Sequence, residues 1–319
     1  MVVIHLIDFI DDKVITESIT TSYNSNQEEY KYLINLLKHS ITRKLLEPFS
    51  LNFEKIELNG MSLGTSSYDI VISPFYDKLI VNHKNLLQVY NISYNRSKRK
   101  EINLSMYSQI THKDGAHFRV MKLMNESGVE YIYASDNRNC VTKCQVSDLI
   151  NEGKHNIIWK SEEYRNMWGL TVFNGKVYAL DYDNGIKVLD CKSGKTLYSE
   201  EILPTIENGY GIHFYSENEL LIGHSKKLEL FKKNDNSWIS VKCSSFTMLD
   251  CYSIFIENLS DLIYVSDSSA NKIHVVRRND LSLVKSHDGF QSQFGMLIDD
   301  RNGLLYVCDT FAHQIRVFK

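Results

Sequence analysis

The feature that most constrains this fold is an internal repeat that begins at residue 68 and continues to the C-terminus. An aromatic residue, a variable residue and an aliphatic residue follow one another six times, at steps of 50, 50, 42, 42 and 42 residues. A period of this length indicates an array of similar units that bury their faces against one another. The six triplets are Tyr68-Asp69-Ile70, Phe118-Arg119-Val120, Trp168-Gly169-Leu170, Tyr210-Gly211-Ile212, Tyr252-Ser253-Ile254 and Phe294-Gly295-Met296.

A second marker keeps step with the first, because an apolar, strand-like segment ending in Asp or His follows each triplet. A polar turn, an alternating segment such as residues 271–276 and a further strand such as residues 281–286 come next. Four short strands in a unit of about 42 residues is typical of a propeller blade. We therefore predict an all-β fold, a six-bladed β-propeller. The residues that end the second strands are His83, Asp136, Asp181, His224, Asp267 and Asp309.

The last unit stops after its third strand, which leaves one blade incomplete. Residues 52–58 lie before Tyr68, where a fourth strand precedes every other unit. Because an unpaired sheet edge exposes backbone donors and acceptors, we predict that residues 52–58 close the ring, so that the propeller spans residues 51–319. Residues 1–50 do not repeat and predict an extension, with a hairpin and an amphipathic helix at residues 27–49. We expect the extension to pack on one face of the ring, and the alternative is that the apolar face of its helix docks another protein.

Composition and charge limit the partners. Net charge is −3, which gives no global attraction to nucleic acid or to anionic lipid. The first twelve residues are interrupted by Asp8 and lack a basic start, so we expect a cytoplasmic protein without membrane contact. The six cysteines are expected to be reduced thiols. Cys140 and Cys144 form the one close pair, with no second pair at zinc-finger spacing, so we predict neither metal nor cofactor.

Residues 303–318 resemble an NHL repeat. The usual form of that repeat is Gly, apolar residues, Tyr-Val-x-Asp, a short turn carrying Asn-His and an alternating strand ending in Phe. Gly303, Tyr306, Asp309, His313 and Phe318 follow this order, and residues 261–276 are a second copy. The resemblance covers residues 68–319 as architecture and the last two blades by motif, while two units carry His in place of Asp. It implies a six-bladed propeller, and some propellers of this family bind single-stranded RNA.

In a propeller, the loops that join second to third strands and each blade to the next open on one face, which is the usual ligand face. The six Asp and His residues that end the second strands are expected there. The favoured interpretation is that each side chain caps its own turn by accepting backbone N–H groups. The alternative is a metal or acid–base site on the channel axis.

The first-strand triplets are expected nearest the axis. Their middle residues are Asp69, Arg119 and four small residues that predict room near the channel mouth. We expect Asp69 and Arg119 to pair with each other in preference to binding an anionic or polar ligand. His117 and His213 flank the region and leave a metal-dependent hydrolase or lyase as an alternative, although no catalytic motif is present. The ligand-face candidates are Asp69, Arg119, His117, His213, Trp168 and Tyr210.

The opposite face is predicted to carry a basic rim, because loops between third and fourth strands are rich in Lys and Arg. Acidic residues in neighbouring loops favour a solvated rim of mixed charge over contact with a phosphate backbone. The leading hypothesis is a non-enzymatic protein-interaction module or scaffold that presents a loop face to a partner. The alternatives are an RNA-binding NHL-type propeller and a metal-dependent hydrolase or lyase. The rim residues are Arg96, Lys98, Arg99, Lys100, Arg277 and Arg278.

Overall fold

The computed structural model describes residues 49–319 except positions 52, 60–65, 85, 95–100, 113–116, 198–205, 207, 236 and 258–259. The hairpin predicted in residues 1–20 and all but the last residue of the helix predicted at residues 27–49 lie outside this part of the chain, as do Arg96, Lys98, Arg99 and Lys100. Among the described residues, no helix is long and apolar enough to cross a membrane.

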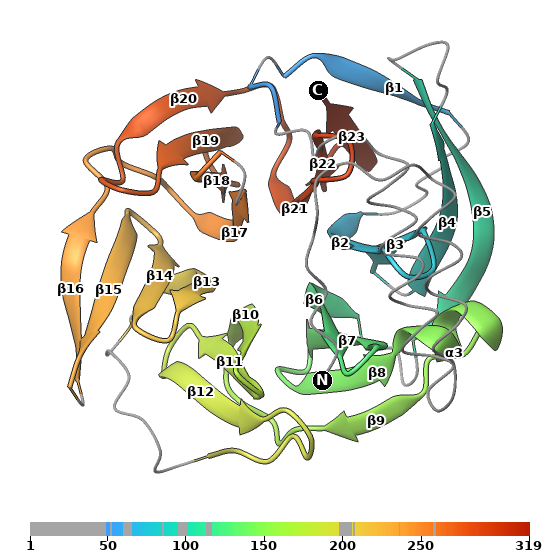
Figure 1. Ribbon diagram of the computed structural model, residues 1–319, viewed down its shortest axis with the longest axis horizontal. Helices are drawn as coiled ribbons and strands as arrows, with labels where there is room; N and C mark the ends of the chain where they lie inside the picture. Colours follow the sequence, from blue (N-terminus) through green and yellow to red (C-terminus); the bar gives the residue numbers. More distant parts are fainter. Residues whose placement is uncertain are drawn as a thin grey trace, which may run out of the picture. The chain divides into compact units, whose positions relative to one another are not determined.

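The strands form six blades around a central axis, which confirms the predicted six-bladed β-propeller (Figure 1). The first blade contains β2 (Ser67–Ser73), β3 (Lys78–His83), β4 (Leu86–Tyr94) and β5 (Glu101–Thr111). The second contains β6 (Phe118–Glu126), β7 (Val129–Asp136), β8 (Val141–Gln145) and β9 (Ile157–Lys160), with the short helix α3 (Val146–Asn151) between its last two strands. The third contains, in the described residues, β10 (Met167–Phe173), β11 (Lys176–Asp181) and β12 (Gly185–Asp190).

The last three blades follow the same order from the axis outward. The fourth contains β13 (Gly209–Ser216), β14 (Glu219–His224), β15 (Leu228–Asn234) and β16 (Ser237–Cys243). The fifth contains β17 (Cys251–Glu257), β18 (Leu262–Asp267), β19 (Lys272–Arg277) and β20 (Leu283–His287). The sixth contains β21 (Gln293–Asp299), β22 (Leu304–Asp309), β23 (Gln314–Phe318) and the early strand β1 (Lys55–Asn59). All six second strands therefore end at the predicted Asp or His.

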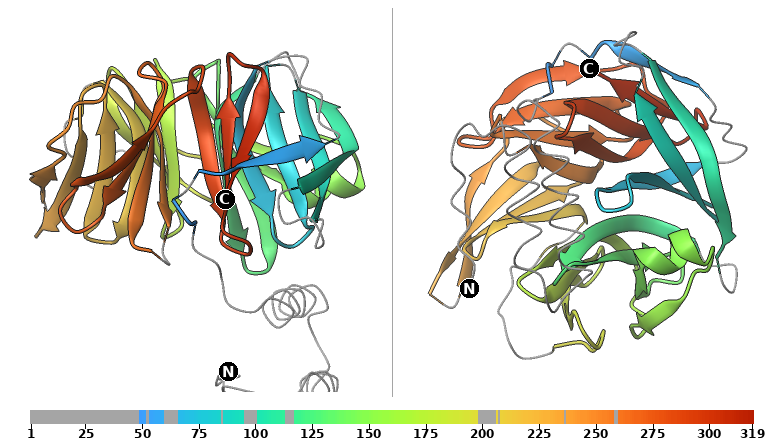
Figure 2. Two further views of the ribbon diagram at one scale, coloured as in Figure 1. Left: turned by 90° about the horizontal axis from the view of Figure 1, so that it is seen from above. Right: turned by 45° about the vertical axis from the view of Figure 1, so that its right-hand side comes forward.

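The strand β1 joins the sixth blade to the first. It pairs antiparallel with β23 through Lys55 and Ile56, and Glu54 and Lys319 exchange two backbone hydrogen bonds of 2.9 Å. It then pairs in parallel with β5, from Glu57 opposite Glu101 onward. One strand thus borders two blades, and these blades make one continuous eight-stranded sheet. Figure 2 shows β1 crossing between them. The outer partner of β23 therefore comes from before Tyr68, and it begins at residue 55, three residues after the start of the predicted segment.

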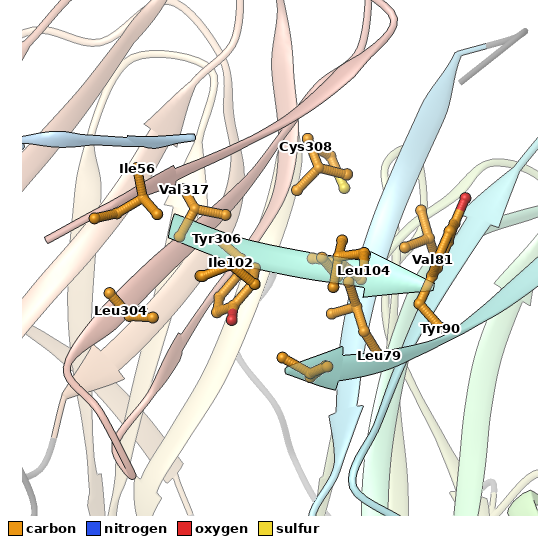
Figure 3. Close-up of a cluster of buried hydrophobic side chains, with 13 residues drawn as sticks. Ile56, Leu79, Val81, Tyr90, Ile102, Leu104, Leu304, Tyr306, Cys308 and Val317 are labelled. Atoms are coloured by element: carbon orange, nitrogen blue, oxygen red, sulfur yellow. The ribbon is translucent and has the colours of Figure 1, made fainter. Parts of the chain in front are cut away.

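An apolar cluster lies beneath this junction. Ile56 is 2% exposed and packs with Tyr306 and Val317 of the sixth blade and with Ile102 and Leu104 of β5 (Figure 3). Burial of side chains from both blades against one strand stabilises closure through the hydrophobic effect as well as through backbone hydrogen bonds.

Aromatic residues just before β1 extend the junction to the fifth blade. The Phe49 N–H donates to Oε1 of Glu257 at 2.5 Å, and the Phe49 ring packs edge-on against Tyr264 with centroids 5.8 Å apart. Phe53 stacks on His287 at 4.2 Å. We call the described residues of 49–59 the clasp. It contacts the fifth, sixth and first blades, whereas the sequence predicted only its strand.

All six cysteines are free thiols, and five of them are buried. Burial raises the pKa of Cys144 to about 12, so its thiol stays protonated and behaves as a small apolar group.

Candidate functional site at the channel mouth

The starts of the first strands and the ends of the second strands lie at the same face of the ring. The backbone register pairs Ser67 with His83, Gly209 with His224 and Cys251 with Asp267. The loops that follow the second strands, and the loops that enter each first strand, therefore open on this side. We call it the mouth face.

Five aromatic side chains surround the axis at the mouth face, one from each of five blades. Phe294 and Tyr252 lie with ring centroids 4.5 Å apart, and Tyr252 and Tyr210 lie 4.6 Å apart. Tyr68 meets Phe294 edge-on at 5.8 Å, and Trp168 meets Tyr210 edge-on at 5.9 Å. Edge-on and tilted contacts of this kind are favourable beyond the apolar area that they bury. We call these five residues the aromatic ring.

The second blade contributes an arginine in place of an aromatic side chain. In the third blade, Met167 pairs with Asp181 at the end of the second strand, and the aromatic Trp168 comes one residue later. In the second blade, Phe118 itself pairs with Asp136 at the end of the second strand. The structural counterpart of Trp168 is therefore Arg119. The predicted triplet of this blade is displaced by one residue. Phe118 is 1% exposed and packs beside His112 and His155, away from the ring.

Arg119 stacks on the aromatic ring and is partly bonded. Its Cζ lies 4.4 Å from the ring centroid of Trp168. Its Nη1 donates to Oδ1 of Asn139 at 3.1 Å and to the Met167 carbonyl at 2.9 Å. The predicted ion pair with Asp69 does not form. Among the described residues, no carboxylate lies within ion-pair distance of Arg119, and neither its Nε nor its Nη2 makes a hydrogen bond.

Asp69 instead bridges two innermost strands. Its Oδ1 accepts the Ile70 N–H at 2.9 Å, and its Oδ2 accepts the Met121 N–H of the second blade at 2.6 Å. Burial raises the pKa of Asp69 to about 6, although Lys122 and the two N–H groups oppose this shift. Asp69 holds strands together, and both of its oxygens are occupied.

The small middle residues do not create the room near the channel mouth that was predicted from the sequence. A Cβ at Gly169 would lie 2.5 Å from the Tyr210 carbonyl, and one at Gly295 would collide with Asp69. These glycines permit close approach of neighbouring first strands. The axial cavity that the aromatic ring lines together with Asp69, Arg119 and Lys122 has about 20 Å³ of free space, enough for roughly one water molecule. The channel is therefore nearly filled, and a larger ligand has to contact the mouth face itself.

The two candidate histidines occupy different surroundings. His117 stacks on Tyr68 at 5.5 Å, and burial together with Arg119 lowers the pKa of its imidazole. His213 lies deeper, on β13, where burial lowers its pKa to about 3, with Lys122 and Arg278 adding to the effect. Both are neutral at pH 7. Within the described residues, no group of three His, Cys, Asp or Glu side chains is arranged to hold a metal ion.

The aspartates that end the second strands accept backbone N–H groups of the mouth-face loops. Asp136 accepts from Arg138 at 3.0 Å and from Cys140 at 2.9 Å. Asp267 accepts from Leu249 at 2.9 Å and from Asp250 at 3.0 Å. Asp181 and Asp309 do the same for Arg165 and Gln291, while His224 contacts Glu229 and His83 is buried. These contacts fix both the turns and the loops that enter the first strands.

The described rim residues on the opposite face are engaged within the protein. Arg278 pairs with Asp261 at 3.0 Å and stacks on Tyr215, and Arg277 donates to the Ser282 hydroxyl at 3.2 Å.

Two large apolar side chains project from fixed loops of the mouth face. Leu249 is 54% exposed, and its N–H is held by Asp267. Phe311 is 65% exposed, and its N–H donates to the Gln291 carbonyl at 3.0 Å. Neither residue is among the candidates predicted from the sequence, because irregular loops have no periodicity that separates exposed from buried apolar residues.

Comparisons with known proteins add little to this geometry. No protein-family model and no curated protein matches the sequence. Among solved structures, the chain is similar to the computationally designed Ika8 protein, with 12% identity, a TM-score of 0.45, and coverage of 82% of this chain and 73% of that one.

Proposed function

We propose that this propeller is a non-enzymatic protein-interaction module and that the mouth face is its binding surface. The observation that carries this proposal is the combination of the aromatic ring and Arg119 with Leu249 and Phe311 exposed on fixed backbone. Aromatic residues and arginine are enriched at the energetic centres of protein interfaces. Loops already held by the second-strand aspartates lose little conformational entropy on binding, which favours affinity.

The alternatives find less support among the described residues. A hydrolase or lyase in the channel needs a substrate site, and the free space there admits about one water molecule. An RNA-binding rim needs cations free to contact phosphates, and Arg278 is already paired with Asp261. The NHL-type RNA-binding propeller therefore ranks second and the metal-dependent enzyme third.

Site-specific photocrosslinking in the full chain tests the proposal. A benzophenone amino acid replaces Phe311 on the mouth face or, as the matched control, the exposed Lys192 after β12 on the opposite face. We expect the Phe311 position to crosslink a discrete protein in extract of the source cell, and the Lys192 position not to do so. Equal crosslinking from both positions, or a product that ribonuclease removes, would contradict the proposal.

A further inference from the structure

Arg119 is a charged group of the cavity lining whose hydrogen-bonding capacity is only partly used. Two hydrogen bonds engage its Nη1, while the Nε and Nη2 edge has no partner in the described part of the chain. This edge presents two parallel N–H donors, the arrangement that a carboxylate accepts in bidentate fashion. Asp136 interacts with the guanidinium by long-range attraction and not by an ion pair. The oxygens of Asp136 instead accept backbone N–H groups and lie near the Lys160 ammonium.

The surroundings strengthen attraction for one negative charge. Arg119 lies against Trp168, and Tyr68 and Tyr252 line the same cavity. Aromatic walls lower the local dielectric constant and so increase the energy of a charge pair. Lys122 offsets the negative charge of Asp69, the carboxylate of the cavity lining, whose two oxygens each accept an N–H group, so the positive charge of Arg119 is left uncompensated there.

The geometry points to an acidic side chain of a protein partner as the occupant: we propose that the mouth binds an Asp or Glu at the tip of a partner's loop or extended segment, with its carboxylate on the Nε and Nη2 edge of Arg119. This proposal rests on the protein-interaction function and gives it a chemistry. Apolar residues beside the acidic residue would contact Leu249 and Phe311, which extend the surface beyond the guanidinium.

A protein carboxylate suits this site better than a polyanion. RNA binding depends on several cations that neutralise successive phosphates, and the chain as a whole carries a net charge of −3. One arginine within an aromatic ring matches one carboxylate with apolar neighbours. The nearly filled channel also restricts the occupant to contact at the surface.

A defined peptide library tests the proposal. Random 12-residue peptides on phage are selected against the immobilised full chain and, in parallel, against the Arg119→Gln variant. We expect wild-type selection to fix an Asp or Glu at one peptide position. Replacing that residue by its amide in a synthetic peptide should weaken binding by about 10- to 100-fold, the range for loss of a charge-assisted hydrogen bond.

The variants separate recognition of the carboxylate from folding. Arg119→Gln should bind the acidic peptide and its amide equally, and Arg119→Lys, which keeps the charge but loses the bidentate edge, should show an intermediate preference. Arg277→Gln makes the same change on the opposite face and should bind like wild type. If circular dichroism shows that Arg119→Gln does not fold, two measurements still test whether Arg119 binds a carboxylate. They are the loss of wild-type affinity for the peptide amide and the reduced preference of Arg119→Lys for the acidic peptide.

Further probes separate the two proposals. Peptides that need Leu249 and Phe311 but do not distinguish acid from amide would overturn the carboxylate assignment and leave the interaction function standing. If no peptide binds and a 12-nucleotide oligouridine binds in an Arg119-dependent manner, both fail. Binding of glutarate as tightly as the peptide would replace the protein partner by a small dicarboxylate and would also overturn the proposal.

Discussion

The seam between the sixth and first blades and the mouth of the channel are held in different ways. At the seam, β1 supplies backbone hydrogen bonds to both blades, and Ile56 completes an apolar cluster. At the mouth, the contacts come from individual side chains: Asp69 bridges two strands, and Arg119 stands where five other blades carry an aromatic residue. The structure of the seam can therefore tolerate substitution of most of its side chains. The structure of the mouth depends on the identity of a few side chains.

Removal of the clasp gives the largest expected effect. Deleting residues 1–60 exposes the outer edges of β23 and β5 and strips Phe49, Phe53 and Ile56 from the core. Each such side chain contributes about 1.5–3 kcal/mol by burial, so the total loss approaches the whole stability of an ordinary domain. We expect aggregation or a melting temperature lower by more than 10 °C.

A shorter deletion sharpens this test. A chain that begins at residue 47 keeps the clasp, including the bond from the Phe49 N–H to Glu257, and should melt much closer to the full chain. Thermal melts followed by circular dichroism compare the two. Equal melting of both truncations would mean that the clasp does not stabilise closure.

The seam was also the more predictable of the two regions. A missing fourth strand and a strand-like segment before the first blade are visible in sequence, because edge pairing follows from strand count. The displacement in the second blade was not predictable, since Phe118-Arg119-Val120 fits the triplet pattern as well as the other five do. The distinction depends on the register of β6 against β7, in which Phe118 itself pairs with Asp136. Contacts such as that of Glu257 with Phe49, 208 residues apart, leave no local pattern either.

At the mouth, the largest effect is expected at Gly295. A Cβ there meets both the carboxylate and the Cα of Asp69, so Gly295→Ala forces two innermost strands apart. Overpacking of this kind should lower the free energy of unfolding by roughly 3 kcal/mol. The matched control is Ser253→Ala, at the equivalent position of the fifth blade, where a Cβ is already accommodated. Urea denaturation of both variants measures the difference, and an unaffected Gly295→Ala would contradict the close approach.

The pH dependence of stability tests Asp69. Its pKa is about 6 in the folded protein and near 3.8 when exposed, so the folded state binds the extra proton between these values. Stability from this group is therefore full below pH 3.8 and falls as pH rises toward 6, by on the order of 3 kcal/mol. His112 and His213, whose folded pKa values are lowered to about 3, act in the opposite direction as pH falls below 6.5.

The difference between wild type and Asp69→Asn isolates the carboxylate, because the histidines are common to both proteins. We expect the wild type to lose stability relative to the variant as pH rises from 4 to 7. Denaturation at five pH values gives the two curves. Parallel curves would show that Asp69 does not titrate in this range.

The smallest effect is expected where the aromatic ring is interrupted. Arg119→Tyr completes the ring: it loses two hydrogen bonds to Asn139 and Met167, each contributing about 0.5–1.5 kcal/mol, and gains aromatic contacts of similar value. The net change in the free energy of unfolding should lie within about 1 kcal/mol.

The substitution also tests the strand register of the second blade. In the alternative register, Phe118 would occupy the aromatic ring and residue 119 would face the next blade, as Gly169 does. A tyrosine at position 119 would then collide with a neighbouring first strand and destabilise the protein severely. The converse exchange, an arginine in place of the aromatic Phe118, provides the contrast. Phe118 is buried beside His112, with its carbonyl bonded to Asn82, so Phe118→Arg should unfold the second blade. If urea denaturation showed Arg119→Tyr to be the more destabilising of the two substitutions, Phe118 and not Arg119 would be assigned to the position in the aromatic ring.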